Sequence, residues 1–447
     1  MVEKRRTALA NAPAVIQGGM GVGVSGWKLA NEVSRSGGLG VVSGTALDLV
    51  LTRRLQNGDV GGDIREALSA FPHRATAQRI LKRYLKVPAI GEPVTYRPTP
   101  QMGLRASKIR DELMVTANFV EVFLARRGHD GPVGINYLEK IQLATPASVY
   151  GAMLAGVDYI LMGAGVPAQI PRLLDAFAAG QKGSIDLTVD GAHTGERFYV
   201  GFDPAAVFGA APELLRPHFL AVVASHAIAA YLARDTATCP DGFIVETPIA
   251  GGHSARPRGP GTFDELGQPI YGPRDEADLE KCRKLGMPFW LAGGFGTPGQ
   301  LRAAQAAGAA GVQVGTAFAL SHDSGMTDAI RTELLRSVLA GDLNVRNDAL
   351  ASPTGFPFKM ATLPATVGVD DVYAERDRNC DLGYLRTAYR KDDGRVGYRC
   401  PSEQPTCTSP KAATWPTPSV DAACATGSRR RSGCRRRGPT AIPKCPW

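Results

Sequence analysis

The feature that most constrains the fold of this chain is an alternation of short apolar segments with helical stretches. Eight apolar segments, rich in Val, Ile, Leu and Phe, lie at 14–19, 39–44, 132–137, 159–163, 219–224, 242–246, 289–293 and 311–315. Apolar runs of this length are typical of strands covered on both faces, as in parallel sheets. Their alternation with helical stretches therefore predicts successive βα units.

Helix boundary residues support these units. Thr145–Pro146 and Thr297–Pro298 each place a capping residue before a Pro at the first helical position, and Gly37–Gly38 follows a helical stretch as a stop. Eight units within about 320 residues favour an α/β fold closed into a (β/α)₈ TIM barrel. An open doubly wound sheet is the alternative.

Two segments interrupt the alternation. Residues 48–130 are much longer than one helix and contain helix-like pieces, which predicts a helical insertion after the second strand. Residues 184–208 alternate like a β-hairpin. We expect the barrel to occupy residues 1–343, an extension packed on it to occupy 344–401, and a basic low-complexity tail, disordered in character, to occupy 402–447.

Composition argues against several classes of function. The net charge is +9, but eight Lys and Arg against two acidic residues place +6 of it in 402–447. The near-neutral remainder predicts no nucleic-acid partner. None of the eight cysteines forms a C-x-x-C pair, so no metal site is expected. The apolar run 219–233 is too short to cross a bilayer and the N-terminus resembles no signal peptide, which predicts a soluble, cytoplasmic protein.

Candidate site residues lie at the carboxyl ends of the strands, where TIM-barrel enzymes place their active sites. Glycines are frequent at these positions and let a large planar or phosphorylated ligand approach the backbone. A Gly-rich loop follows the seventh strand, and Gly315–Thr316 follows the eighth. Loops of these two units form the phosphate site of many barrels. We therefore expect Gly294, Gly315 and Thr316 to hold a phosphate group.

Six motifs, VIQGGMGVG, GINYLEK, LMGAGVP, AGGH, LAGGFGT and GVQVGTAF, occur in this order. In this order they resemble the nitronate monooxygenases, or 2-nitropropane dioxygenases, a family of FMN-dependent TIM-barrel enzymes. The resemblance covers about residues 13–340. It implies that residues 1–343 bind FMN across the barrel mouth. It also implies oxidation of alkyl nitronates or nitroalkanes with O₂ to carbonyl compounds and nitrite, the substrate and O₂ being the expected partners.

The resemblance further implies roles for individual residues. The flavin ring would be contacted by Gly19, Met20, Asn136 and Gly252. The phosphate would be held by Gly293, Gly294, Gln313, Gly315 and Thr316. His253, the histidine of AGGH, would lie near the flavin and act as a base toward the substrate, since the pKa of imidazole lies near the working pH.

Some positions depart from the family pattern or leave alternatives open. Position 19 is often Pro in the family, and the insertion could cap the barrel mouth. Arg256 and Arg258 either favour an anionic substrate or are exposed loop residues, and His226 is a second candidate at the same rim. Two other functions stay open. One is an FMN-dependent NAD(P)H reductase of enoyl thioesters or quinones, and the other is a flavin-binding module with a nucleic-acid-binding tail.

Overall fold

The computed structural model describes residues 13–86, 95–259, 261, 263–375 and 383–400. The tail expected over 402–447 lies outside these residues. Within the described part, one parallel sheet is formed by β1 (Val15–Gln17), β2 (Gly40–Ser43), β3 (Val133–Leu138), β4 (Tyr159–Gly163), β8 (His218–Val223), β9 (Gly242–Glu246), β10 (Phe289–Ala292) and β11 (Gly311–Val314). These eight strands match the eight apolar segments of the sequence.

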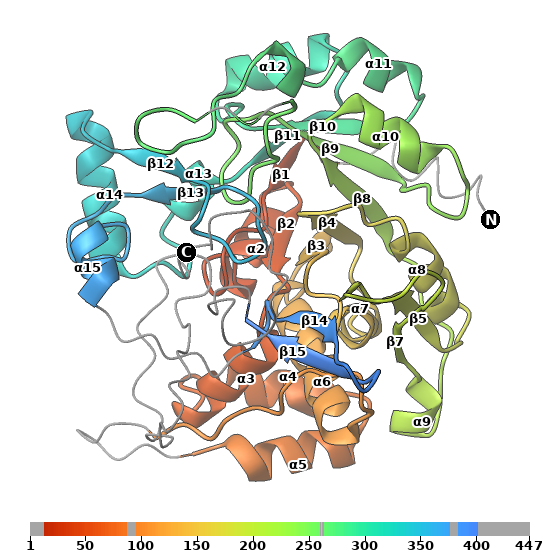
Figure 1. The fold of residues 1–447 in the computed structure, drawn as a ribbon. Coiled ribbons are helices and arrows are strands. Elements are labelled where there is room, and N and C mark those ends of the chain that lie inside the picture. Colours follow the sequence, from red (N-terminus) through yellow and green to blue (C-terminus); the bar gives the residue numbers. More distant parts are fainter. Residues whose placement is uncertain (1–12, 87–94, 260, 262, 376–382, 401–447) are drawn as a thin grey trace.

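The sheet closes on itself. Neighbouring strands follow chain order, and β11 returns to pair in parallel with β1. A parallel bridge between Ile16 and Leu39 joins β1 to β2 and completes the circle. The predicted (β/α)₈ barrel is thus confirmed, and the open sheet is excluded (Figure 1).

Helices surround the sheet on its outer side (Figure 1). They are α2 (Trp27–Arg35), α6 (Lys108–Ala125), α7 (Thr145–Leu154), α8 (Ile170–Ala178), α10 (His226–Ala233), α11 (Leu279–Lys284), α12 (Pro298–Ala306), α13 (Thr316–Ala319) and α14 (Asp328–Ala340). The cap predicted at Thr297 is confirmed, because its hydroxyl oxygen accepts the N–H of Gln300. The cap predicted at Thr145 is wrong: Ala144 precedes the helix, and the Thr145 hydroxyl donates to the carbonyl of Ile141.

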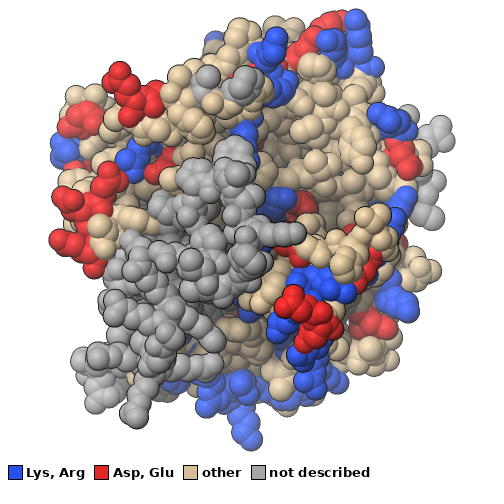
Figure 2. All heavy atoms as spheres, viewed as in Figure 1, with Lys and Arg blue, Asp and Glu red and all other residues tan. Residues whose placement is uncertain are grey.

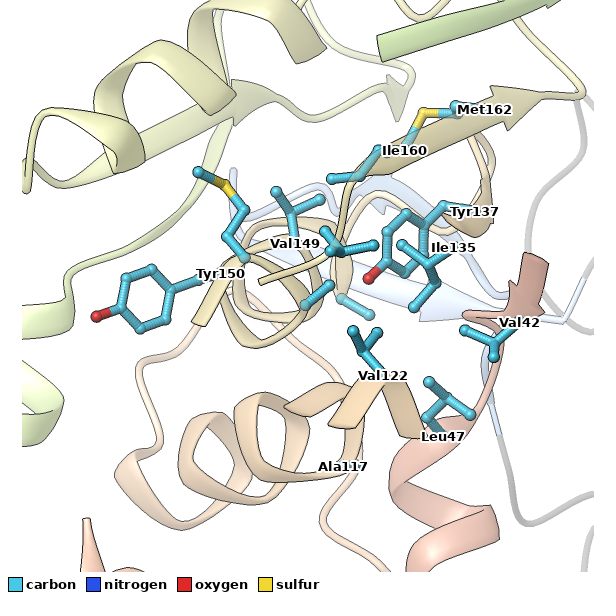
Figure 3. Close-up of a cluster of buried hydrophobic side chains, with 14 of the residues drawn as sticks. Val42, Leu47, Ala117, Val122, Ile135, Tyr137, Val149, Tyr150, Ile160 and Met162 are labelled. Atoms are coloured by element: carbon cyan, nitrogen blue, oxygen red, sulfur yellow. The ribbon is translucent and has the colours of Figure 1, made fainter. Parts of the chain in front are cut away.

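Strand side chains alternate between two apolar clusters. Inside the barrel lie Ile16, Leu39, Val41, Tyr159, Leu161, Leu220, Ile244, Trp290 and Ala292. Residues of opposite parity, such as Ile135 and Ile160, point outward and pack against Val122 of α6 and Val149 of α7 (Figure 3). Because both faces are buried, the strands carry the continuous apolar runs seen in the sequence.

The predicted helical insertion is confirmed. After β2 the chain forms α3 (Leu47–Gln56), α4 (Asp63–Ala70) and α5 (Arg74–Tyr84) before α6 begins. Helices α3, α4 and α5 contact α6, which itself packs on α2 and α7. The described part of the insertion therefore adds a layer outside α6, on the outer side of the barrel (Figure 1).

Smaller elements complete the described chain. The predicted hairpin is confirmed as β5 (Gly183–Asp186) paired with β7 (Tyr199–Phe202), and α9 (Pro204–Phe208) follows it. The remaining elements are β6 (Val189–Asp190), a 3₁₀ turn η2 (Pro273–Asp275), β12 (Val345–Asp348), β13 (Phe358–Ala361), α15 (Asp370–Glu375), β14 (Thr387–Arg390) and β15 (Val396–Arg399). Strand β14 joins β15 to β6, and β12 pairs with β13.

The described surface carries charges of both signs. Acidic and basic side chains are interspersed around its edge, with Lys and Arg gathered at the position of α5 (Figure 2). Such mixing is usual for a globular surface. Among the helices of the described residues, none combines the length and apolar character needed to cross a membrane.

Candidate active site

Polar side chains replace apolar ones where the interior of the barrel opens at the carboxyl ends of the strands. Asn136 pairs with the inward-facing Leu161, so its side chain shares the inner face. Glu246 and Gln313 both pair with the inward-facing Ala292. The inner face at the barrel mouth therefore carries the amides of Asn136 and Gln313 and the carboxyl group of Glu246. Sequence reasoning singled out Asn136 and Gln313 but missed Glu246.

Gly19 and Asn136 are brought into direct contact. A Cβ atom on Gly19 would stand 1.9 Å from Oδ1 of Asn136, so no larger residue fits while that side chain keeps its place. This contact explains why position 19 is occupied by Gly in this chain. Oδ1 of Asn136 is buried and has no hydrogen-bond partner within the described chain. An unpaired buried oxygen costs about 1–3 kcal/mol, which a bound ligand with an N–H group would relieve.

Ser25 holds the loop that follows β1. Its hydroxyl oxygen accepts the backbone N–H of Met20 at 2.9 Å and a hydrogen bond from the Gln17 amide at 3.0 Å. The Met20 side chain packs against the apolar cluster that includes Val24 and Ala319. Met20 thus lies at the rim of the barrel with its backbone anchored, and the flavin contact expected for it stays a prediction.

The two glycine loops expected to bind phosphate lie next to each other. Gly293 and Gly294 have φ values of +93° and +82°, which side-chain-bearing residues rarely adopt. A Cβ on Gly293 would meet the Thr247 hydroxyl at 2.3 Å. Because β10 and β11 are paired, this loop neighbours the start of α13, where Gly315 and Thr316 lie. The space beside the Cα of Gly315 is open within 4 Å.

His253 lies in the loop after β9, immediately beyond Gly252. Gly252 has φ +77° and open space beside its Cα, as a position close to a planar ligand requires. Nε2 of His253 lies 2.7 Å from the hydroxyl oxygen of Ser352, and the imidazole packs edge-on against Phe358 at 4.8 Å between ring centroids. The histidine therefore sits between the mouth of the barrel and the segment around β13.

Burial lowers the pKa of His253 from 6.5 to about 4. No charged partner offsets this effect, because burial is its sole cause. The imidazole is therefore neutral at pH 7. A neutral imidazole with so low a pKa donates or accepts a hydrogen bond readily, but it is a weak base.

Glu246 and Lys359 form a second titratable pair at the mouth. Burial raises the pKa of Glu246 to about 7, although the positive charge of Lys359 opposes the shift. Burial also lowers the pKa of Lys359, whose ammonium group donates to the carbonyl of Pro248 at 2.8 Å. Glu246 is the one charged residue of its apolar strand, a signal available in the sequence. Lys359 and Ser352 lie about a hundred residues beyond Glu246 and His253 in the chain, and no motif around them indicates a site.

A small cleft opens beside this pair. Its lining includes Glu246, Ser254, Tyr271 and the two arginines of the loop, Arg256 and Arg258. Both arginines are exposed. The guanidinium groups donate to main-chain carbonyls, that of Arg256 to Gly355 and that of Arg258 to Ala224, each at 2.8 Å. Of the two alternatives for Arg256 and Arg258, this arrangement agrees with exposed loop residues, although both arginines lie at the rim of the cleft.

The remaining candidate, His226, is engaged elsewhere. It begins α10, and its Nδ1 accepts the N–H of Asp278, the residue that caps α11. It therefore ties two outer helices together. Among the described residues, no three His, Cys, Asp or Glu side chains lie close enough to share a metal ion.

The residues at the mouth fit a flavin. Asn136 offers an unpaired buried oxygen, Gly252 and Gly315 leave open backbone, and the loop at Gly293–Gly294 adopts a conformation that favours glycine. A planar ring system with amide-like edges and a phosphate tail meets these three demands. The predicted residues lie at or just after the carboxyl ends of the parallel strands, and therefore at one end of the barrel.

Comparison with known proteins finds one family model that matches part of the chain. Residues 207–347 match the family described as nitronate monooxygenase. No curated protein shows significant similarity to the chain. The resemblance expected from the sequence is confirmed over this segment, which holds β8 to β11 and His253. With it, the expected class of enzyme, a flavin-dependent oxidoreductase, is confirmed.

Several solved structures are similar at low sequence identity. FabK from Thermotoga maritima is 18% identical, with 81% of this chain and 75% of that chain covered and a TM-score of 0.41. Nitroalkane oxidase from Streptomyces ansochromogenes is 17% identical, with coverages of 78% and 76% and a TM-score of 0.38. The enoyl reductase domain of MlnA from Bacillus amyloliquefaciens is 10% identical, with coverages of 84% and 70% and a TM-score of 0.40.

Proposed function

We propose that this chain is an FMN-dependent nitronate monooxygenase that oxidises alkyl nitronates with O₂ to carbonyl compounds and nitrite. The observation that carries the proposal is the family match over residues 207–347. That segment contains His253 and both glycine loops of the barrel mouth, so the matched half of the barrel is the half that bears the candidate chemistry.

FMN would be held by residues from both halves of the barrel. Asn136 would pair its unpaired Oδ1 with the ring system, while Gly19, Met20 and Gly252 would border the ring. The phosphate would be held by Gly293, Gly294, Gln313, Gly315 and Thr316. Bound FMN supplies an acceptor for the electrons of the substrate and the capacity to react with O₂.

The environment of His253 favours nitronates over neutral nitroalkanes as substrates. A neutral nitroalkane must lose its α-proton to a base before oxidation, and a base with a pKa of about 4 removes that proton slowly. A nitronate arrives already deprotonated and needs only hydrogen-bond donors and orientation. We therefore infer that His253 contacts the substrate as a neutral imidazole and that the nitronate is the form consumed.

The decisive measurement is the visible spectrum of the purified full chain, mixed without oxygen against an alkyl nitronate and, separately, against NADPH. Reduction of the flavin by the nitronate alone, with nitrite released once air is admitted, is the expected result. Bleaching by NADPH alone would instead make the chain a reductase of the type that acts on enoyl thioesters or quinones. Protein that takes up no FMN would overturn the cofactor assignment.

A pair of histidine variants tests the role of the site. His253→Ala is expected to lower the rate of reduction by nitronate at least tenfold, because the side chain at the mouth is removed. His193→Ala is the matched control, since that imidazole lies exposed in the turn of the β5–β7 hairpin. Equal rates in the two variants would contradict the placement of the active site.

A further inference from the structure

We propose that Ser352 and Thr354, in the segment between β12 and β13, hold His253 as the tautomer with its proton on Nδ1. In this form the imidazole donates a hydrogen bond to an oxygen of an anionic nitronate and does not act as a base. The inference rests on the proposed function for the identity of the anion. Ser352 and Thr354 act through His253 and are positioning residues.

The segment around β13 forms backbone hydrogen bonds with the residues on both sides of His253. The backbone N–H of Ser254 donates to the carbonyl of Pro357 at 2.8 Å, and that of Lys359 donates to the carbonyl of Gly252 at 3.0 Å. His253 itself forms an antiparallel bridge with Phe358, whose ring contacts the imidazole. The orientation of the imidazole is therefore set by a strand that lies about a hundred residues further along the chain.

Two hydroxyl groups continue the hydrogen-bond chain from Nε2. The Ser352 side chain is fully buried, and its oxygen lies 2.7 Å from Nε2 of His253 and 2.8 Å from the Thr354 hydroxyl. The Ser352 oxygen also accepts the N–H of Thr354, and the Thr354 hydroxyl oxygen accepts the N–H of Phe356. Nε2, Ser352 and Thr354 thus form one continuous chain of hydrogen bonds.

Among the described residues, only one direction of this chain gives every hydroxyl proton an acceptor. If Thr354 donates to Ser352, then Ser352 donates to Nε2, and every hydroxyl proton has an acceptor. In the opposite direction the Thr354 proton has no acceptor within the described residues. The first arrangement makes Nε2 the acceptor and places the ring proton on Nδ1. Nδ1 makes no hydrogen bond within the described chain and is the nitrogen left for a ligand.

A donor at this position suits an anionic substrate. The negative charge of a nitronate resides largely on its two oxygens, and an N–H donor in a buried site stabilises such a charge more strongly than one in water. The donor keeps its proton throughout, so no acid–base step is required of His253. This role also agrees with the neutral state of the imidazole at pH 7.

Nitrogen NMR of the full chain labelled with ¹⁵N-histidine tests the tautomer directly. The His253 signals are assigned by their loss in His253→Gln. Wild-type protein is expected to show Nε2 as the unprotonated nitrogen, and Ser352→Thr is expected to keep this pattern. Ser352→Ala and Thr354→Val are expected to shift the ring toward a mixture of tautomers. Thr366→Ala, which removes a hydroxyl of the same region that bonds to Leu363, serves as the control.

The kinetic arm of the test uses the same variants. Ser352→Ala is expected to lower kcat/KM for an alkyl nitronate about tenfold, as the loss of one oriented hydrogen bond predicts. Ser352→Thr is expected to restore it. If Ser352→Ala folds poorly, Thr354→Val probes the same hydrogen-bond chain one residue further from the ring.

The outcomes separate this inference from the proposed function. A wild-type chain that turns over nitronates with its proton on Nε2 contradicts the inference alone. So does a Ser352→Ala variant whose tautomer and kinetics match wild type. A wild-type chain with the proton on Nδ1 but no reaction with nitronates contradicts the proposed function and the identity of the anion. The positioning of His253 by Ser352 then still stands.

Discussion

At the scale of single residues, the barrel mouth is built from pairs that only the folded chain brings together. Gly19 follows β1 and Asn136 lies in β3, yet each determines what the other position can hold. The sequence motifs predicted both residues as neighbours of a flavin, but not their mutual contact, because a steric relation across 117 residues leaves no local pattern.

A double-mutant cycle measures this contact. Gly19→Ala is expected to destabilise the chain by about 1–3 kcal/mol, because its Cβ would overlap Asn136 Oδ1. In an Asn136→Ala background the same substitution should cost less, since the Oδ1 and Cγ atoms are gone and only the Cβ atom of residue 136 stays close, at 2.8 Å. Chemical denaturation of the four proteins gives the coupling free energy. Additive effects of the two substitutions would contradict the contact.

At the scale of elements, a feature could be predicted when the residues that determine it lie close together in the sequence. The eight strands were predictable because a strand buried on both faces must be apolar throughout, and this is visible in five residues. The cap at Thr297 was predictable because all its partners lie within three residues. The pairing of β13 with the His253 loop was not predictable from the sequence. It is made by backbone hydrogen bonds, which almost any sequence could form.

The cap of α12 provides a prediction at this scale. Thr297 and Gln300 form a capping box directly after the loop that carries Gly293 and Gly294. Thr297→Ala is expected to lower the free energy of unfolding by about 1 kcal/mol, while Thr297→Ser keeps most of it. Because the loop ends at this cap, FMN affinity measured by flavin fluorescence should fall in the Ala variant. An FMN affinity equal to that of wild type would show that the cap of α12 does not support the proposed phosphate site.

At the scale of the whole molecule, buried titratable groups link the barrel to the segments that follow it. Asp48 lies in the first turn of α3 and is 1% exposed, and its carboxyl group accepts a hydrogen bond from the Tyr384 hydroxyl. At the mouth, Lys359 donates to the carbonyl of Pro248 and its charge acts on the pKa of Glu246, and Ser352 bonds to His253. Each link joins the barrel to residues beyond position 343. The sequence predicted an extension there but no chemical connection, because these charged and hydroxyl side chains are typical of surfaces as well.

The pH dependence of stability tests the link at Asp48. Burial raises the pKa of Asp48 from 3.8 to about 7 in the folded chain. Between these values the unfolded chain is ionised at this position while the folded chain is protonated. Stability due to Asp48 is therefore lost as the pH rises from about 4 to 7, and the loss is complete above pH 7.

Asp48→Asn removes this titration while keeping an oxygen that can accept the Tyr384 hydroxyl. Its free energy of unfolding, relative to wild type, should be higher at pH 8 than at pH 5 by roughly 2–3 kcal/mol. Urea denaturation at several pH values gives this difference. The control is Asp235→Asn, which makes the same substitution at an exposed position. A constant difference between Asp48→Asn and wild type from pH 5 to 8 would show that Asp48 is ionised in the folded chain, and that the contact with Tyr384 is made by a carboxylate.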